Sequence, residues 1–102
     1  MRLEHESVEK VKNEVLKIIS KYLDLQKYKV FFFGSRINGY SHERSDIDLG
    51  IEGPEAIPFL VLGKIKGEIE DLPILYKIEV VDFKNVSDKF KRVALEHAET
   101  IN

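Results

Sequence analysis

The sequence contains no cysteine. This absence excludes a disulfide framework and a thiolate metal site, and it fits a reducing compartment. The chain also lacks an apolar run of the roughly 18 residues that a membrane span needs. Its first residues, M-R-L-E-H-E-S, carry acids where a secretory signal would have an apolar core. Together these features predict a cytoplasmic protein without a membrane span.

No charge of one sign dominates the sequence. Sixteen Lys and Arg residues stand against 18 Asp and Glu residues, which leaves a net charge of -2. Such a balance offers no broad electrostatic attraction to nucleic acid, so we expect no direct nucleic-acid binding. The 102 residues, 43% of them hydrophobic, are enough for one compact core but too few for two ordinary domains. We therefore expect a single soluble domain over residues 1–102.

The spacing of apolar residues divides the chain into helices and strands. Steps of three and four residues predict amphipathic helices, whereas short β-branched and aromatic runs predict strands. The expected elements, in chain order, are a helix over 3–25, a strand over 29–33, a short helix over 35–40, a strand over 46–52, a helix over 58–71, a strand over 75–83 and a last helix opened by Asn85 or Ser87. This order predicts an α/β (α+β) fold, in which helices cover one face of a small mixed sheet.

The stretch from Gly34 to Asp48, G-S-R-I-N-G-Y-S-H-E-R-S-D-I-D, combines a Gly-Ser turn with two aspartates. Asp46 and Asp48 are two positions apart in an expected strand, so their carboxylates share one face while Ile47 points to the other. Two like charges this close are best tolerated with a divalent cation between them. Oxygen ligands of this kind suit magnesium or manganese, which fills its remaining positions with waters and phosphate oxygens.

The turn itself predicts a phosphate site. Gly34 allows the backbone to approach a ligand closely, and the N–H groups that begin the next helix present partial positive charge. The hydroxyl of Ser35 adds a further donor. Arg36 beside this turn is either a phosphate or acceptor contact or an ordinary surface charge. Ser45 either braces the loop before Asp46 or contacts the substrate directly.

A third acid is expected from the strand K-I-E-V-V-D-F. Glu79 and Asp82 lie an odd number of positions apart, so a regular strand places them on opposite faces. Ile78 and Val80 form the core-facing pair, which sends Glu79 to the open face beside the aspartates. Glu79 is thus the expected third carboxylate, and Asp82 is the reserve candidate.

The pattern G-S-R-x-x-G-x-x-x-x-x-S-D-x-D resembles the signature of the minimal nucleotidyltransferases of the DNA polymerase β superfamily, and the element order is similar over almost the whole chain. The resemblance implies metal-dependent transfer of a nucleoside monophosphate from a nucleoside triphosphate, with release of pyrophosphate. It implies that Gly34 and Ser35 hold the outer phosphates and that Asp46 and Asp48 bind two magnesium ions. The third acid of the family is commonly aspartate, so Glu79 is a departure from its pattern.

Stand-alone chains of this size resemble the antitoxin half of toxin–antitoxin pairs whose other half is a HEPN-domain ribonuclease. This likeness implies an enzyme that uses ATP to place AMP on a tyrosine of its partner. One alternative is a binding module that neutralises its HEPN partner by contact alone, a reading that the departure at Glu79 keeps open. A further alternative, ranked low because no acceptor-binding domain is visible, is a small-molecule nucleotidyltransferase.

Overall fold

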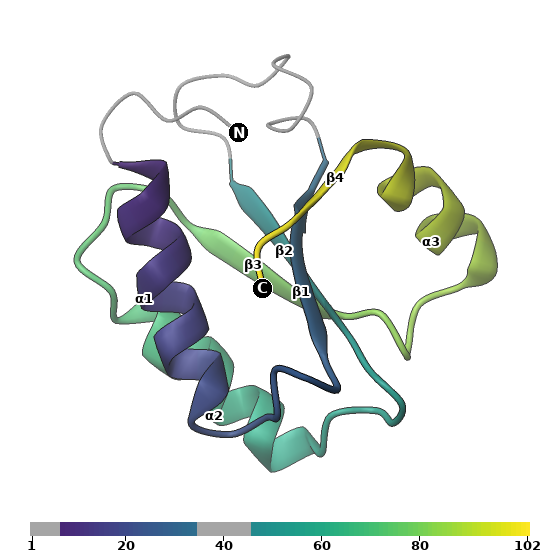
Figure 1. Cartoon of the computed structure of the whole chain (residues 1–102), viewed down its shortest axis with the longest axis horizontal. Helices are drawn as coiled ribbons and strands as arrows, with labels where there is room; N and C mark the ends of the chain where they lie inside the picture. Colours follow the sequence, from purple (N-terminus) through teal and green to yellow (C-terminus); the bar gives the residue numbers. More distant parts are fainter. Residues whose placement is uncertain (1–6, 35–45) are drawn as a thin grey trace.

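The computed structural model describes residues 7–34 and 46–102, and Figure 1 shows their arrangement. The elements are α1 (Val8–Ser20), β1 (Lys29–Phe33), β2 (Ile47–Glu52), α2 (Phe59–Glu70), β3 (Ile78–Asp82), α3 (Asp88–Ala94), a 3-10 helix η1 (Leu95–His97) and β4 (Ala98–Thr100). The short helix expected over 35–40 lies outside the described residues. None of the helices within the described ranges is both long and apolar enough to cross a membrane.

The strands form one mixed sheet in the order β3-β2-β1-β4. β1 runs antiparallel to both β2 and β4, whereas β2 and β3 are parallel. Parallel neighbours need a crossover connection, and α2 supplies it. The predicted small mixed sheet is confirmed. β4 was not predicted, because its three residues A-E-T carry no apolar alternation; it is defined by pairing with Phe31–Phe33 of β1.

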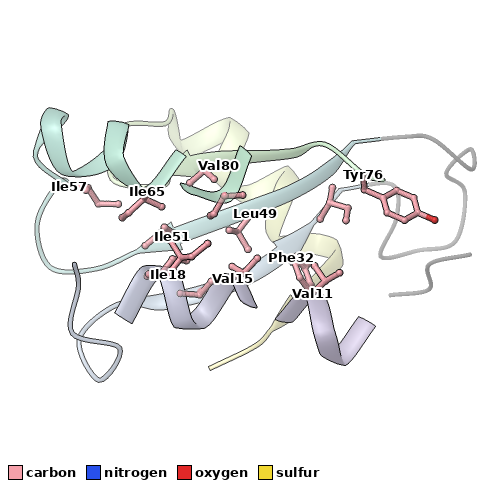
Figure 2. Close-up of a cluster of buried hydrophobic side chains, with 14 residues drawn as sticks. Val11, Val15, Ile18, Phe32, Leu49, Ile51, Ile57, Ile65, Tyr76 and Val80 are labelled. Carbon is pink, nitrogen blue, oxygen red and sulfur yellow. The ribbon is translucent and has the colours of Figure 1, made fainter. Parts of the chain in front are cut away.

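α1 and α2 cover one face of the sheet, as predicted. α1 begins after Ser7, whose side chain accepts a hydrogen bond from the backbone N–H of Lys10, and it buries residues at steps of three and four. Figure 2 shows side chains of α1, α2 and the strands meeting in one cluster. The cluster includes Val11, Val15, Ile18, Phe32, Leu49, Ile51, Ile65 and Val80. This packing fixes which face of each strand remains open for function.

α3 packs on the opposite face of the sheet, so the prediction that the helices cover one face is wrong for this last helix. It begins after Ser87, one of the two predicted caps, whose side chain accepts from the N–H of Phe90 at 3.1 Å. Phe31, Phe33 and Phe83 form a second buried cluster with Ala94 of α3. The rings of Phe31 and Phe83 meet edge to face, with centroids 4.8 Å apart. This smaller cluster occupies part of the face that also bears Asp48, because Phe33 and Asp48 are register partners.

Candidate active site

Asp48 and Glu79 stand opposite each other on neighbouring strands. The parallel register pairs their Cα atoms directly, so both side chains leave the same face of the sheet. Asp46 immediately precedes β2 and is exposed, Asp48 is half-buried, and Glu79 is exposed. The structure thus brings the three predicted carboxylates to one end of two adjacent strands, and the α1–α2 face lies behind them.

The carboxylates repel one another. Burial raises the pKa of Asp48 above its ordinary value, and the negative charges of Asp46 and Glu79 raise this pKa further. An acid whose ionised form is disfavoured by its neighbours gains from any cation that enters the cluster. The electrostatics of this end of the sheet therefore favour a positively charged ligand.

Lys77 supplies one positive charge that the sequence reasoning missed. Its Nζ lies 3.1 Å from Oε1 of Glu79, and both side chains are well exposed. The hydrogen bond that Lys77 donates to Glu79 raises the pKa of Lys77, and the charges of Glu79 and Asp46 act in the same direction. The only signal in the sequence is the spacing Lys-x-Glu within a strand, which places both side chains on one face. An exposed pair of this kind is weak and can open when a stronger cation competes.

Gly34 ends β1 directly against Asp48. Its φ is +91°, a conformation that side-chain-bearing residues rarely adopt. A Cβ at this position would lie 2.4 Å from Oδ2 of Asp48. The glycine of the predicted phosphate turn is therefore in contact range of the central carboxylate. Ser35, Arg36 and Ser45, which were predicted to contact the nucleotide, lie outside the described residues.

Asp82 has a different environment from Glu79. It is buried, with 6% of its surface exposed. Its carboxylate accepts hydrogen bonds from the N–H of Ile57 at 2.8 Å, the N–H of Lys84 at 3.0 Å and the side-chain amide of Asn85 at 3.3 Å. It pairs in register with Ile51, whose side chain points to the face covered by α1 and α2. Asp82 thus braces the turns around the end of β3, and the geometry favours Glu79 of the two candidates.

Comparison with known proteins gives the family. The family model described as polymerase beta nucleotidyltransferase matches residues 13–102. The chain belongs to this nucleotidyltransferase family. A curated relative from Haemophilus influenzae, named "Probable protein adenylyltransferase MntA", is 28% identical over 85 residues, which cover 81% of this chain and 75% of the relative.

Solved structures share the fold of this nucleotidyltransferase. One is a chain of a toxin–antitoxin crystal structure with AMP-PNP, with a TM-score of 0.73, 15% identity, and coverage of 89% of this chain and 72% of that one. Another belongs to a complex of the tri-AMPylated HEPN toxin of Shewanella oneidensis with an MNT antitoxin, with a TM-score of 0.70, 12% identity, and coverage of 92% and 71%. At such identities the likeness shows the fold alone.

The acidic groups of this nucleotidyltransferase fit magnesium by their chemistry. Asp46, Asp48 and Glu79 offer only carboxylate oxygens, the donors that magnesium and manganese prefer. Among residues 7–34 and 46–102, no group of three His, Cys, Asp or Glu side chains is arranged to enclose an ion. Magnesium is usually bound by one or two carboxylates and completes its shell with waters and phosphate oxygens. An open acidic edge therefore suits an ion that arrives with its nucleotide.

Proposed function

We propose that this nucleotidyltransferase transfers AMP from ATP to a tyrosine hydroxyl of a HEPN-domain partner, and that it acts as the antitoxin of that partner. The observation that carries the proposal is the register pairing of Asp48 with Glu79 beside Gly34. The adenylyltransferase name of the Haemophilus relative and the HEPN–MNT complexes of similar fold support the choice of AMP and of a HEPN partner. We assign the reaction to the cytoplasm, where ATP and magnesium are available.

The reaction is an in-line displacement at phosphorus. The tyrosine oxygen attacks the α-phosphorus of ATP and forms a new P–O bond. The bond between this phosphorus and the oxygen bridging to the β-phosphorus breaks, and its electron pair leaves with pyrophosphate. The proton of the tyrosine hydroxyl passes to the carboxylate of Glu79 and from there to water. Atoms and charge balance without a further reactant.

Each named residue has a role in this scheme. Gly34 and Ser35 hold the outer phosphates, Arg36 contacts them, and Ser45 braces the loop that carries Asp46. Asp46, Asp48 and Glu79 would hold magnesium. When bound, two such ions neutralise charge on the attacking and leaving oxygens, and manganese supplies the same chemistry. The contribution of the chain is a row of oxygen ligands on rigid strands, which holds the α-phosphorus in line between the two oxygens.

The test is intact-mass spectrometry of the product of the neighbouring gene, taken as the candidate HEPN partner. It is incubated with the nucleotidyltransferase, magnesium and each nucleoside triphosphate in turn. We expect a gain of one AMP per modified tyrosine with ATP, and loss of this gain in the Asp46→Asn/Asp48→Asn variant. The matched control is Glu55→Gln/Asp88→Asn, which removes two exposed carboxylates that follow β2 and β3 at the strand ends far from the site. No gain in mass with any triphosphate would contradict the proposal.

One observation favours contact alone as a second candidate. Glu79, the third carboxylate of the proposed site, is engaged by Lys77. A contact antitoxin would silence its partner equally well without Asp46 and Asp48. Growth rescue of toxin-expressing cells separates the two functions: rescue that survives Asp46→Asn/Asp48→Asn supports contact, and rescue that is lost while the complex still forms supports AMP transfer.

A further inference from the structure

The groups of the candidate site lie in a row across the sheet. Gly34 ends β1, Asp48 is on β2 and Glu79 is on β3, and the strand order places β3 at the rim of the sheet (Figure 1). Under the proposed function, the outer phosphates of ATP lie at the Gly34 end of this row. In-line displacement then requires the acceptor at the opposite end, beyond Glu79. The outer edge of β3 is the surface that meets this requirement.

The outer edge of β3 has backbone groups available for pairing. The bonds from Ile47 N to Lys77 O and from Phe83 N to Ile51 O mark the two ends of the β2–β3 ladder. Backbone groups alternate in direction along a strand. The N–H and C=O groups of the odd-numbered residues from Lys77 to Phe83 therefore face β2. The N–H and C=O groups of Ile78 and Val80 therefore point outward, and neither has a backbone partner in the part of the chain that the structure describes.

A cavity of about 490 Å³ runs beside this edge. Its walls come from the end of α2, from the turn before β3 and from β3 itself; the residues used below are Lys66, Glu70, Leu75, Lys77, Ile78, Glu79 and Val80. Leu75 stands at its rim with 72% of its surface exposed. We call this surface the β3-edge groove. It is continuous with the candidate site because Glu79 belongs to both.

We propose that the β3-edge groove receives the acceptor segment of the protein partner as an extended strand, an inference that rests on the proposed function. Outward N–H and C=O groups at every second residue match the backbone of an extended polypeptide, and a sugar or nucleotide offers no such repeat. Pairing with Ile78 and Val80 aligns the segment along β3. Leu75 packs against an apolar side chain of the segment, and the tyrosine hydroxyl reaches Glu79.

The charged residues of the groove influence which residues can flank the tyrosine in the bound segment. Lys66 lines the groove on α2, and Lys77 lines it beside Glu79. Lys77 is exposed and pairs with Glu79, so its ammonium would lie beside a segment bound along β3. The lining carries both signs of charge, because Glu70 and Glu79 stand in it beside Lys66 and Lys77, so the groove favours no excess of one charge around the tyrosine. The expected occupant is thus an extended, tyrosine-bearing stretch of the HEPN protein.

A matched pair of variants tests the groove. Leu75→Glu places a negative charge at its rim, and Leu60→Glu makes the same change on α2 outside the groove, where Leu60 is 75% exposed. We expect Leu75→Glu to raise the KM for the HEPN-domain protein by at least about tenfold with little change in kcat, because the charge opposes docking and not the chemical step. Leu60→Glu should leave the KM within about twofold of the wild-type value. Equal KM values for all three proteins would overturn the groove and leave AMP transfer standing.

Amide hydrogen exchange keeps the two proposals separate. In the isolated protein the outward amides of Ile78 and Val80 should exchange quickly, and in the complex their exchange should slow by at least about tenfold. If the wild-type protein transfers no AMP, the proposed function fails, yet protection of these two amides in the complex still supports the groove. An unprotected β3 edge in the complex, or no complex at all, overturns it. Protection without the partner, in a self-associated form, would assign the edge to a second copy of this chain instead.

Discussion

The carboxylate of Asp48 occupies the position that a side chain at Gly34 would need. A Cβ at Gly34 would lie 2.4 Å from Oδ2 of Asp48, and the φ of +91° disfavours any side chain there independently. The positive φ favours glycine at the end of β1, and the contact adds the smaller cost of turning the carboxylate of Asp48 aside. These two causes can be separated experimentally, because only one of them involves Asp48.

Gly34→Ala should lower the free energy of unfolding by about 1–3 kcal/mol through backbone strain and the clash with Asp48. Asp48→Ala in the same protein removes the clash but leaves the strain. Urea denaturation of the wild type, both single variants and the double variant gives the coupling energy. We expect the double variant to be more stable than the sum of the single effects by at least about 0.5 kcal/mol. Strict additivity would show that the strained φ alone selects glycine.

Asp48→Asn should stabilise the metal-free protein at neutral pH. The pKa of Asp48 is raised in the folded state, mainly by burial and then by Asp46 and Glu79, so the folded protein holds this proton more tightly than the unfolded chain does. Stability is therefore lost as the pH rises from the ordinary value of 3.8 through the higher folded value. Because the side chain is only half-buried, we expect a gain of less than about 1 kcal/mol.

Thermal denaturation of wild type and Asp48→Asn across acidic to neutral pH checks this sign. The difference in melting temperature should be largest at neutral pH and should vanish in acid, where Asp48 is protonated in both states. A difference that stayed constant with pH would mean that repacking, and not charge, stabilises the variant.

Asp82→Ala should mainly lower stability, whereas Glu79→Gln should mainly lower activity. Asp82→Ala removes three hydrogen bonds and leaves the N–H of Ile57 without its acceptor, at a cost of about 1–3 kcal/mol. Glu79→Gln changes an exposed side chain, so its effect on stability should stay below about 1 kcal/mol. Its AMP transfer should fall by about a hundredfold or more, since the general base is lost. Stability comes from urea denaturation, and transfer is followed by mass spectrometry at a temperature where both variants are folded. The reverse pattern of activity would reassign the third carboxylate to Asp82.

Two glycine substitutions should change stability in opposite directions. A Cβ at Gly50 would lie 2.5 Å from the ring of Phe31 and 2.7 Å from that of Phe83, so Gly50→Ala should cost about 1–3 kcal/mol by overpacking. A Cβ at Gly63 in α2 meets nothing within 4 Å, so Gly63→Ala should stabilise the helix by about 0.5–1 kcal/mol. Calorimetric melting of the two variants measures both effects. A loss of stability in Gly63→Ala would mean that this face of α2 is covered in solution.

Short sequence patterns predicted the existence of β1, β3 and α2, but they placed the ends of these elements with unequal success. The run K-V-F-F-F is apolar and ends at a glycine, and its predicted strand matches β1 at both ends. Leu75 and Tyr76 have strand propensity, yet they lie in the turn before β3, so the predicted strand began three residues too early. Phe59 and Leu60 were counted in the apolar series of α2, but they precede the turn of the helix that reaches the sheet and are 87% and 75% exposed.

The candidate site was predicted as far as alternation along single strands allows. Spacing put Asp46 and Asp48 together, and the core-facing pair Ile78 and Val80, with the pattern of the family that the sequence resembles, chose Glu79 over Asp82. The register of Asp48 with Glu79 depends on pairing between strands separated by α2, which no short window contains. The same limit concealed part of the environment of Lys77: Glu79, the main cause of its raised pKa, is local, whereas Asp46, which raises this pKa further, precedes another strand. Non-local pairing also explains why β4 was missed.

The placement of Gly34, Asp48 and Glu79 on three different strands has a consequence for folding kinetics. A β1–β2 hairpin can form early from neighbouring segments, but β3 joins it only after the α2 crossover has closed, and such non-local parallel pairing is slow. A chain halted at the hairpin stage would carry the glycine and the aspartates without the glutamate. The complete acidic edge thus exists only in chains that have closed the α2 crossover, and a chain halted at the hairpin does not carry it.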